Sequence, residues 1–469
     1  MLARIAANDS ARMNALENRN EIDGGPAAEG AQPNQPVTYA RRLGAWSAAM
    51  VVVGGVIGSG IFLTPAAIAR QTGSSAEQLI AWGIGGVLAL IGALCYGELG
   101  ARRPQAGGGY VNLREAFGLI VAFLYGWNML AVNYSGSLAA VATVFVNYAA
   151  AACGYTLKNP APYAVGAIVF LAGINWFGIR AGSFVQNLLT VLKIAALAAL
   201  IVIGLLVRGA PPITAPTPAL NPIALGGVLL PVLFSYGGWA YANNIAAEIR
   251  EPQRNLPRAL MFGMLLVAAC YLLANVAYLA VLGHAGLAAS KAPAADLMRH
   301  AFGEVGARAI AVGIAISTLG FCNISLIGAA RVFQAMGADG VFFRVAGKLH
   351  PRWRTPNIAL LMIAGWAIVL ALTGTFDQLL NYSTTGDWLG YAAVVATLFW
   401  YRSARRNEPV GFKVPLFPLL PALFLIAVAW VLAATIWKSP SDAGMGALIT
   451  IGGLPIYFVW RYVLGRRKA

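Results

Sequence analysis

The chain has 469 residues, of which 59% are hydrophobic and only 11% are charged. Soluble globular domains contain about 45–50% apolar and about 25% charged residues, so this composition excludes a soluble enzyme, a disordered chain and a nucleic-acid-binding module. The net charge of +16 does not indicate nucleic acid either, because the basic residues lie at the ends of apolar runs and not in one patch.

The chain begins with a polar segment, residues 1–40, which lacks the apolar core and cleavage site of a signal peptide, so we expect a disordered cytoplasmic tail. Long apolar runs follow and predict an all-α polytopic membrane protein with about twelve transmembrane helices. The expected spans are 44–70, 78–100, 120–150, 162–180, 183–207, 223–249, 258–282, 305–336, 357–374, 379–401, 415–437 and 443–464.

The distribution of basic residues predicts the orientation of these spans. With the N-terminus inside, the inner side receives 22 basic residues and the outer side seven. Loops on the cytoplasmic side of membrane proteins carry the excess of Lys and Arg. We therefore expect both termini in the cytoplasm and most of the positive charge at the inner surface.

Two spans contain glycine-rich stretches that are poor helix material. The first span carries four glycines within Gly54–Gly60, followed by Pro65, and the sixth carries two within Phe234–Trp239. Each glycine costs about 1 kcal/mol in a helix relative to alanine. Lipid cannot satisfy freed backbone groups, so a break survives only against protein or an aqueous cavity.

These glycines have two interpretations. They permit close packing of helices, or they interrupt the helices around a substrate. The two stretches lie five spans apart, so the second half of the chain is inverted relative to the first. Interrupted segments in corresponding positions of inverted halves indicate the central site of a transporter, and we favour this interpretation.

The chemistry of the two breaks predicts the ligand. Free N–H groups of Gly58, Ser59 and Gly60 begin a half-helix, whose positive dipole end attracts a carboxylate. Free carbonyl groups around Phe234 and Ser235 accept hydrogen bonds from an ammonium group. Both groups together describe an α-amino acid.

Three sequence blocks resemble the amino acid–polyamine–organocation superfamily, and most of all its L-type amino acid transporter branch with bacterial relatives. They are GVIGSGIFLTP at 55–65, CYGELGARRPQAGGGYVNLREAFG at 95–118 and FSYGGWAYANNIAAEIREPQRNLPRA at 234–259. The resemblance implies the leucine-transporter fold, with inverted five-helix repeats over 41–210 and 211–403 and two further helices over 404–469. It implies these substrate-binding residues: Ile57, Gly58, Ser59, Gly60, Ile61, Phe234, Ser235, Tyr236 and Gly237. Phe234 matches the family's aromatic gate.

Lys193 lies ten residues into an apolar run. A charge at this depth costs several kcal/mol unless it is paired or faces a cavity, and it lies too deep to reach the inner interface easily. The resemblance implies a fifth-helix lysine that contacts the first helix, occupies the area of a sodium site and couples substrate binding to conformation. Ser317 and Thr318 match a hydroxyl pair nearby, so we expect transport without sodium.

Several other polar residues have two interpretations. We expect ordinary interfacial charges at the ends of the second and sixth spans, with an inner-gate ion-pair network as the alternative, for Glu98, Arg102, Arg103, Glu248, Arg250 and Glu251. We expect Asp387 to be hydrogen-bonded near the outer surface, with a proton carrier or cation selector as the alternative. Three asparagines either tune the side-chain pocket or bridge helices: Asn128, Asn133 and Asn323.

Other classes of protein lack support in the sequence. The four cysteines form no CxxC pair and the three histidines lie outside the apolar runs, so we expect no metal, no cofactor and no enzyme. A channel would need a carbonyl filter or charge rings, and neither is evident. Cys153 lies where L-type subunits bond to a heavy chain, but its flanking sequence does not match, so we expect no such partner.

We therefore expect a secondary amino acid transporter of the plasma membrane, here a bacterial inner membrane, that works by alternating access. Apart from Asp387, no acidic residue lies in the middle of a span, which favours neutral L-amino acids. We expect sodium-independent exchange, because Lys193 disfavours coupling to sodium. The alternatives are proton-coupled symport and antiport of cationic amino acids or polyamines.

Overall fold

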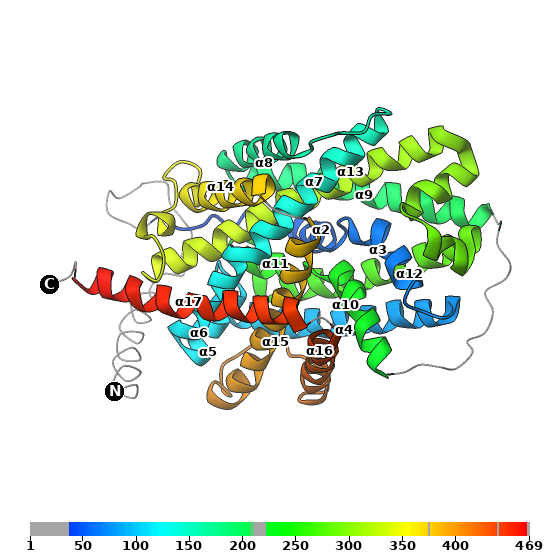
Figure 1. Cartoon of the computed structure of the whole chain (residues 1–469). Coiled ribbons are helices and arrows are strands. Elements are labelled where there is room, and N and C mark those ends of the chain that lie inside the picture. Colours follow the sequence, from blue (N-terminus) through cyan, green and yellow to red (C-terminus); the bar gives the residue numbers. More distant parts are fainter. Residues whose placement is uncertain (1–36, 208, 210–221, 374–375, 439, 467–469) are drawn as a thin grey trace. The chain divides into compact units, whose positions relative to one another are not determined.

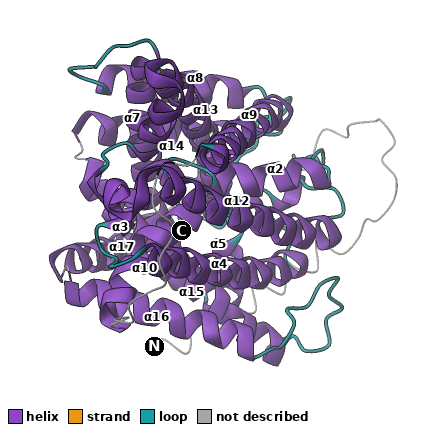
Figure 2. Ribbon diagram, turned by 90° about the vertical axis from the view of Figure 1, so that its right-hand side faces the viewer, coloured by secondary structure: helices purple, strands orange, loops and turns teal. Residues whose placement is uncertain are grey.

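The structure, a computed structural model, describes residues 37–207, 209, 222–373, 376–438 and 440–466. The described residues from Tyr39 onward form one compact unit. The expected tail over 1–40 lies almost entirely outside the described residues. Helices joined by loops make up the described chain, and no strand occurs in it (Figures 1 and 2).

The elements in chain order include single-turn π and 3-10 segments, which carry the label η. They are α2 (Ala45–Val56), α3 (Gly60–Ala69), α4 (Ser75–Arg102), α5 (Gly109–Phe117), α6 (Leu119–Asn128), η1 (Met129–Asn133), α7 (Tyr134–Ala152), α8 (Ala161–Trp176), α9 (Ile179–Leu206), α10 (Pro222–Tyr236), α11 (Tyr241–Asn244), η2 (Ala246–Glu248), α12 (Pro252–Ala289), α13 (Pro293–Ala338), η3 (Arg344–Gly347), α14 (Asn357–Thr373), α15 (Phe376–Ala404), α16 (Leu419–Lys438) and α17 (Pro440–Arg466).

Within the described ranges, seven helical stretches are long and apolar enough to cross a membrane: Ala45–Ala69, Ser75–Arg102, Leu119–Ala152, Ile179–Leu206, Pro252–Ala289, Pro293–Ala338 and Leu419–Trp437. Four shorter apolar helices accompany them: Ala161–Trp176, Leu225–Tyr236, Asn357–Thr373 and Gly444–Trp460. The chain is therefore a polytopic α-helical membrane protein, as its composition predicts. Every expected span overlaps a helix, but the number of crossings and the inverted repeats stay predictions.

Some boundaries differ from those expected. The fourth expected span runs to residue 180, but α8 ends at Trp176 and α9 begins at Ile179. Gly178 makes the turn between them with φ of 110°, a conformation that glycine adopts without strain. The eighth expected span begins at residue 305, whereas α13 begins at Pro293 and bends at Phe302–Gly303. The polar linker before the span is thus itself helical.

The first span is interrupted, as its glycines predict. Helix α2 ends at Val56 and α3 begins at Gly60, and the residues between them have left the helix. The break is shorter than the glycine-rich stretch, because Gly54 and Gly55 remain inside α2. A Cβ on Gly55 would lie 2.8 Å from the carbonyl oxygen of Gly238, so this glycine permits close packing. Close packing therefore explains Gly55, and interruption of the helix explains Gly58.

The sixth span is interrupted too. Helix α10 ends at Tyr236, and the chain then turns through Gly237 and Gly238 into the short helix α11. Gly238 has φ of 107°, and its backbone N–H donates to the hydroxyl of Tyr391, 3.2 Å away. A Cβ there would lie 2.2 Å from the carbonyl oxygen of Gly55, so the two interrupted segments cross backbone to backbone.

Hydrogen bonds also join the segments at their ends. The backbone N–H groups of Arg42 and Leu43 donate to the carbonyl of Glu248 at 2.9 Å, and the N–H of Arg250 donates to the carbonyl of Leu43 at 2.8 Å. Long helices surround the pair: α12 packs against α2 and α3, and α13 packs against α2, α7 and α9 (Figure 1). The two broken segments thus occupy the interior of the bundle.

Replacing Gly238 by alanine should destabilise the protein by about 1–3 kcal/mol, because the new side chain meets both an unfavourable φ and a backbone oxygen. We expect a lower melting temperature of the purified protein in detergent. The control is Gly83→Ala on α4, where a Cβ would meet no atom within 4 Å. Equal melting temperatures for the two variants would contradict the prediction.

Candidate functional site

A cavity lies where the two interrupted segments meet, with walls from α2, α3, α7, α10, α11, α13 and α15. Its lining residues are Val56, Gly58, Ser59, Gly60, Ser137, Val141, Phe234, Ser235, Gly237, Gly238, Tyr241, Phe321, Asp387, Trp388 and Tyr391. Residues from both halves of the chain therefore meet around one space inside the bundle.

Most of the expected substrate-binding residues lie around this cavity. Gly58, Ser59 and Gly60 line it from the first break, and three residues line it from the sixth span: Phe234, Ser235 and Gly237. Three further expected residues are not among its lining residues: Ile57, Ile61 and Tyr236. The ring of Tyr236 instead packs against Trp82 and Tyr271, with centroid distances of 5.7 and 5.0 Å.

The start of α3 supplies hydrogen-bond donors to the cavity. The first N–H groups of a helix have no partner within the helix, and the helix dipole makes this end positive. Ser59 is the N-cap residue, but its hydroxyl does not cap the helix. This side chain is 4% exposed and faces the cavity. The local chemistry therefore suits an anion such as a carboxylate.

Hydroxyl groups join α3 to α10 beside the cavity. The hydroxyls of Thr64 and Ser235 lie 2.7 Å apart, and Thr64 also donates to the carbonyl of Gly60 at 2.9 Å. Ser235 donates to the carbonyl of Pro231 at 3.1 Å. The Gly237 N–H donates to the carbonyl of Phe234 at 3.2 Å, which leaves that oxygen one lone pair for a ligand.

Lys193 lies directly behind the first break. Its side chain is fully buried, and its Nζ donates to the carbonyl oxygens of Ile57 at 2.6 Å and Gly54 at 3.0 Å. The hydroxyl of Ser317 donates to the carbonyl of Gly58 at 2.9 Å. The contact between Lys193 and the first helix, which the family resemblance implies, is confirmed, and the lysine does not reach either surface.

Two tyrosines of α12 satisfy further carbonyls near this break. The hydroxyl of Tyr271 donates to Val56 at 3.0 Å and that of Tyr278 to Ile61 at 3.2 Å. Thr318 does not take part, because its hydroxyl bonds to carbonyls of its own helix, α13. Side chains from three helices thus hold the first segment in its broken form.

Sequence reasoning missed several lining residues: Ser137, Val141, Tyr241, Phe321, Trp388 and Tyr391. Only spacing could have pointed to some of them. Phe321 follows Ser317 by four residues and Tyr391 follows Asp387 by four, which places each pair on one face of a helix. The aromatic wall is closely packed, with the Trp239 and Tyr391 ring centroids 4.7 Å apart.

Comparison with known proteins agrees with this arrangement. A family model described as amino acid permease matches residues 43–459. The chain belongs to the amino acid permease family. Its resemblance to the amino acid–polyamine–organocation superfamily, and to the L-type branch with bacterial relatives, is confirmed.

The permease is similar to three relatives over nearly its whole length. The serine/threonine exchanger SteT of Bacillus subtilis is 31% identical over 436 residues, which cover 92% of this chain and 98% of the relative. The large neutral amino acids transporter small subunit 2 of Mus musculus is 32% identical and covers 96% and 87%. The b(0,+)-type amino acid transporter 1 of Homo sapiens is 33% identical and covers 92% and 90%.

Asp387 lines the cavity of the permease, and its expected position near the outer surface stays a prediction. Its side chain is half-buried and hydrogen-bonded to Asn133. The other two asparagines bridge helices, one of the two interpretations of the sequence. Asn323 donates to Gly182 and Gln186 on α9, and Asn128 donates to Thr450 on α17 at 2.7 Å.

The charges at the end of α4 form buried ion pairs. The carboxylate of Glu98 is fully buried and accepts from Arg102 at 2.8 Å, Arg402 at 2.7 Å and the N–H of Val414 at 2.7 Å. The expectation of ordinary interfacial charges is wrong here, because Glu98 is buried and pairs both with Arg102 of its own helix and with Arg402 of a distant segment. It is wrong for Glu248 as well, which is 1% exposed and pairs with Arg331 at 3.1 Å. The expectation holds for two exposed residues, Arg250 and Glu251.

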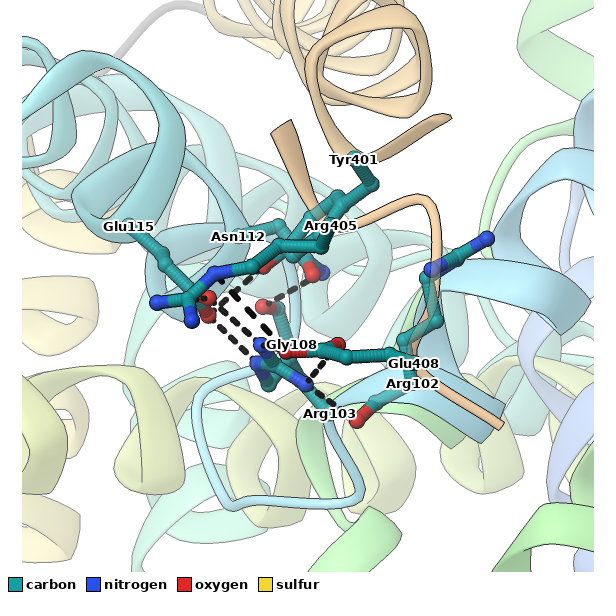
Figure 3. A network of polar contacts seen from close by, with 8 residues as sticks. All are labelled: Arg102, Arg103, Gly108, Asn112, Glu115, Tyr401, Arg405 and Glu408. Atoms are coloured by element: carbon teal, nitrogen blue, oxygen red, sulfur yellow. Dashed lines mark hydrogen bonds and ion pairs between the residues drawn. The ribbon is translucent and has the colours of Figure 1, made fainter. Parts of the chain in front are cut away.

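Arg103 is the centre of a second network, which joins α4, α5 and α15 (Figure 3). It donates to Glu115 at 2.6 Å and to Glu408 at 3.0 Å, and the hydroxyl of Tyr401 donates to Glu115 at 2.9 Å. Burial of the Glu115 carboxyl opposes its ionisation, but the hydrogen bonds and charge of Arg103 outweigh this effect. The pKa of Glu115 therefore lies below its usual value of 4.5.

Replacing Glu115 by glutamine should destabilise the permease by about 1–3 kcal/mol at neutral pH, because it removes a charged acceptor from a mostly buried network. Since the folded-state pKa is lowered, this stabilisation is complete above the unfolded value of about 4.5 and is lost as the pH falls through the folded value. The difference in melting temperature between wild type and variant should shrink in acid.

The control is Glu304→Gln. Arg299 also donates to Glu304, at 2.6 Å, but this carboxyl is exposed. Its replacement should change the melting temperature little at any pH. A Glu304 variant as unstable as the Glu115 variant would mean that burial of the network does not matter.

Proposed function

We propose that this permease is a transporter, not an enzyme, that carries α-amino acids across the membrane by alternating access. The observation that supports this is the meeting of two interrupted segments at one cavity. The start of α3 offers N–H groups of Gly58, Ser59 and Gly60 for a carboxylate. The end of α10 offers carbonyl oxygens around Phe234, Ser235 and Gly237 for an ammonium group. No other common metabolite carries both groups on one carbon atom.

The remaining expected site residues act through their backbone in this proposal. Ile57 and Ile61 flank the donors of the first break, and Tyr236 ends the helix before the second. Phe234 is half-buried at the cavity and serves as the gate over the substrate. Closing of an aromatic ring over the bound substrate would give the loaded carrier a different conformational preference from the empty one.

We propose the leucine-transporter arrangement for the chain, with twelve spans, inverted repeats over 41–210 and 211–403, and two further helices. Its support is the position of the two breaks, five spans apart. We propose that both termini lie in the cytoplasm and that the membrane is the plasma membrane, and the distribution of basic residues supports this orientation. The buried ion pairs of Glu98, Arg103 and Glu248 then lie at the inner side, where they would separate when the carrier opens inward.

The names of the relatives favour exchange of neutral amino acids. Lys193 favours transport without sodium, because its Nζ already binds the carbonyl oxygens that a cation at this place would need. Coupling follows from the same contact, since the first segment cannot move away from Lys193 without breaking these hydrogen bonds. Ser317 belongs to the same coupling site, and Thr318 flanks it on α13.

Counterflow in proteoliposomes tests the function. Purified permease in vesicles loaded with an unlabelled neutral amino acid should accumulate the labelled amino acid from outside, and empty vesicles should accumulate much less. Leucine, serine and threonine are suitable first substrates. A rate that does not depend on the internal amino acid would contradict exchange, and no uptake of any amino acid would contradict the function itself.

Replacing Lys193 by alanine should impair uptake by at least about tenfold while the protein still reaches the membrane, because the carbonyls of Gly54 and Ile57 lose their donor. The matched control is Lys291→Ala, which removes an exposed lysine. Initial rates normalised to purified protein measure the effect. Unchanged uptake kinetics in the Lys193 variant would remove this residue from the mechanism.

A further inference from the structure

Asp387 is the one charged side chain among the residues that line the described cavity. The segments that recognise the ends of an amino acid, at α3 and α10, form one part of the wall. Asp387 lines the same cavity from α15, with Ser137 of α7 and Phe321 of α13. A substrate held by its carboxylate and ammonium groups would therefore occupy the same space as this carboxyl group.

The neighbours of Asp387 are polar but uncharged. The amide of Asn133 in η1 hydrogen-bonds to the carboxyl. Five tyrosines lie near enough to sense its charge: Tyr96 of α4, Tyr125 of α6, Tyr134 of α7, Tyr241 of α11 and Tyr391 of α15. Phenol groups have ordinary pKa values near 10, so they do not ionise in the physiological range.

Among the described residues, no arginine, lysine or histidine is found to pair with Asp387. Lys193 is engaged behind the first break by the carbonyls of Gly54 and Ile57. The arginines of the Arg103 network are engaged by Glu115 and Glu408. The carboxyl of Asp387 thus lacks a counter-ion within the part of the protein that the structure describes.

An ionised carboxylate inside a membrane protein costs several kcal/mol unless a positive charge accompanies it. The amide of Asn133 offsets part of this cost but supplies no charge. When the cavity closes over a substrate and excludes water, the cost rises. A closed, loaded cavity is therefore stable only with one positive charge next to Asp387.

We propose that Asp387 accepts one positive charge in each loaded state of the carrier. The charge is the side-chain cation of a basic amino acid, or a proton that enters with a neutral one. This inference rests on the proposed function, because it assumes that an amino acid occupies the cavity. It adds that basic and neutral substrates occupy the same cavity with opposite dependence on pH.

The sign of that dependence follows from linkage. A neutral substrate prefers the protonated carboxyl, so its apparent affinity rises as the pH falls. A basic substrate prefers the ionised carboxyl, so its apparent affinity falls as the pH falls. Protonation of Asp387 thus changes the preference of the cavity from basic to neutral substrates, while the tyrosines and Asn133 stay neutral.

The test uses the purified full-length permease in proteoliposomes. Counterflow of labelled leucine is measured at about pH 5.5 and about pH 7.5. At each pH, unlabelled leucine or unlabelled lysine is added outside as the competitor. If a proton supplies the charge, leucine should bind several-fold more tightly in acid. If the side chain of a basic substrate supplies the charge, lysine should compete at about pH 7.5, and its apparent affinity should fall several-fold in acid. Either trend supports the proposal and identifies the source of the charge.

Asp387→Asn keeps the shape of the side chain and removes its charge. This variant should lose lysine competition by about tenfold or more and lose the pH dependence of leucine competition. The control is Asp296→Asn, which removes a carboxyl bonded to Arg299 outside the cavity. It should retain both properties of the wild type.

Wild-type protein alone can overturn the proposal, so a variant that fails to fold does not leave it open. Leucine counterflow that is independent of pH and insensitive to lysine would contradict the charge on Asp387 but keep the proposed function. No counterflow of leucine, serine or threonine would contradict the proposed function itself. An Asp387→Asn protein with unchanged pH dependence and unchanged lysine competition would also overturn the inference.

Discussion

Backbone groups released inside a membrane must find partners in the protein, and this constraint shapes the interior of the permease. The break between α2 and α3 frees carbonyl oxygens where no water is available. Side chains from three surrounding helices donate to them: Lys193 from α9, Tyr271 and Tyr278 from α12, and Ser317 from α13. Each donor ties the broken segment to a different helix, so the segment cannot move without changing several hydrogen bonds.

The same constraint explains which groups are left for a ligand. Protein donors satisfy the carbonyl side of the first break, whereas the amide side at Gly58–Gly60 opens to the cavity. Asp387 lines the same cavity, and nothing in the described chain is found to neutralise it. The cavity therefore combines a positive helix end, which suits a carboxylate, with a carboxyl group that calls for one further positive charge.

Buried charges, like free backbone groups, must find partners within the protein. Glu98 and Glu248 are paired with arginines that lie far away in the sequence, and Glu115 is paired with Arg103 of the preceding segment, so each pair joins two segments. Burial makes an unpaired partner costly, so such contacts stabilise one arrangement of the segments over others. In an alternating carrier they would contribute to the free-energy difference between the two conformations.

Composition, hydropathy and the spacing of glycines determined the class of protein, the approximate spans and the positions of both breaks, because these depend on local sequence and on the properties of lipid. The depth of Lys193 within its run likewise predicted a contact with the interior. Tertiary structure alone decided that Asp387 faces the cavity, that Tyr236 faces away from it, and that Glu98 and Glu248 are buried. Which face of a helix meets the cavity, and which distant charge meets another, depends on the rotation and packing of whole helices. That rotation cannot be predicted from this sequence, because apolar residues surround its helices and few charged positions mark one face.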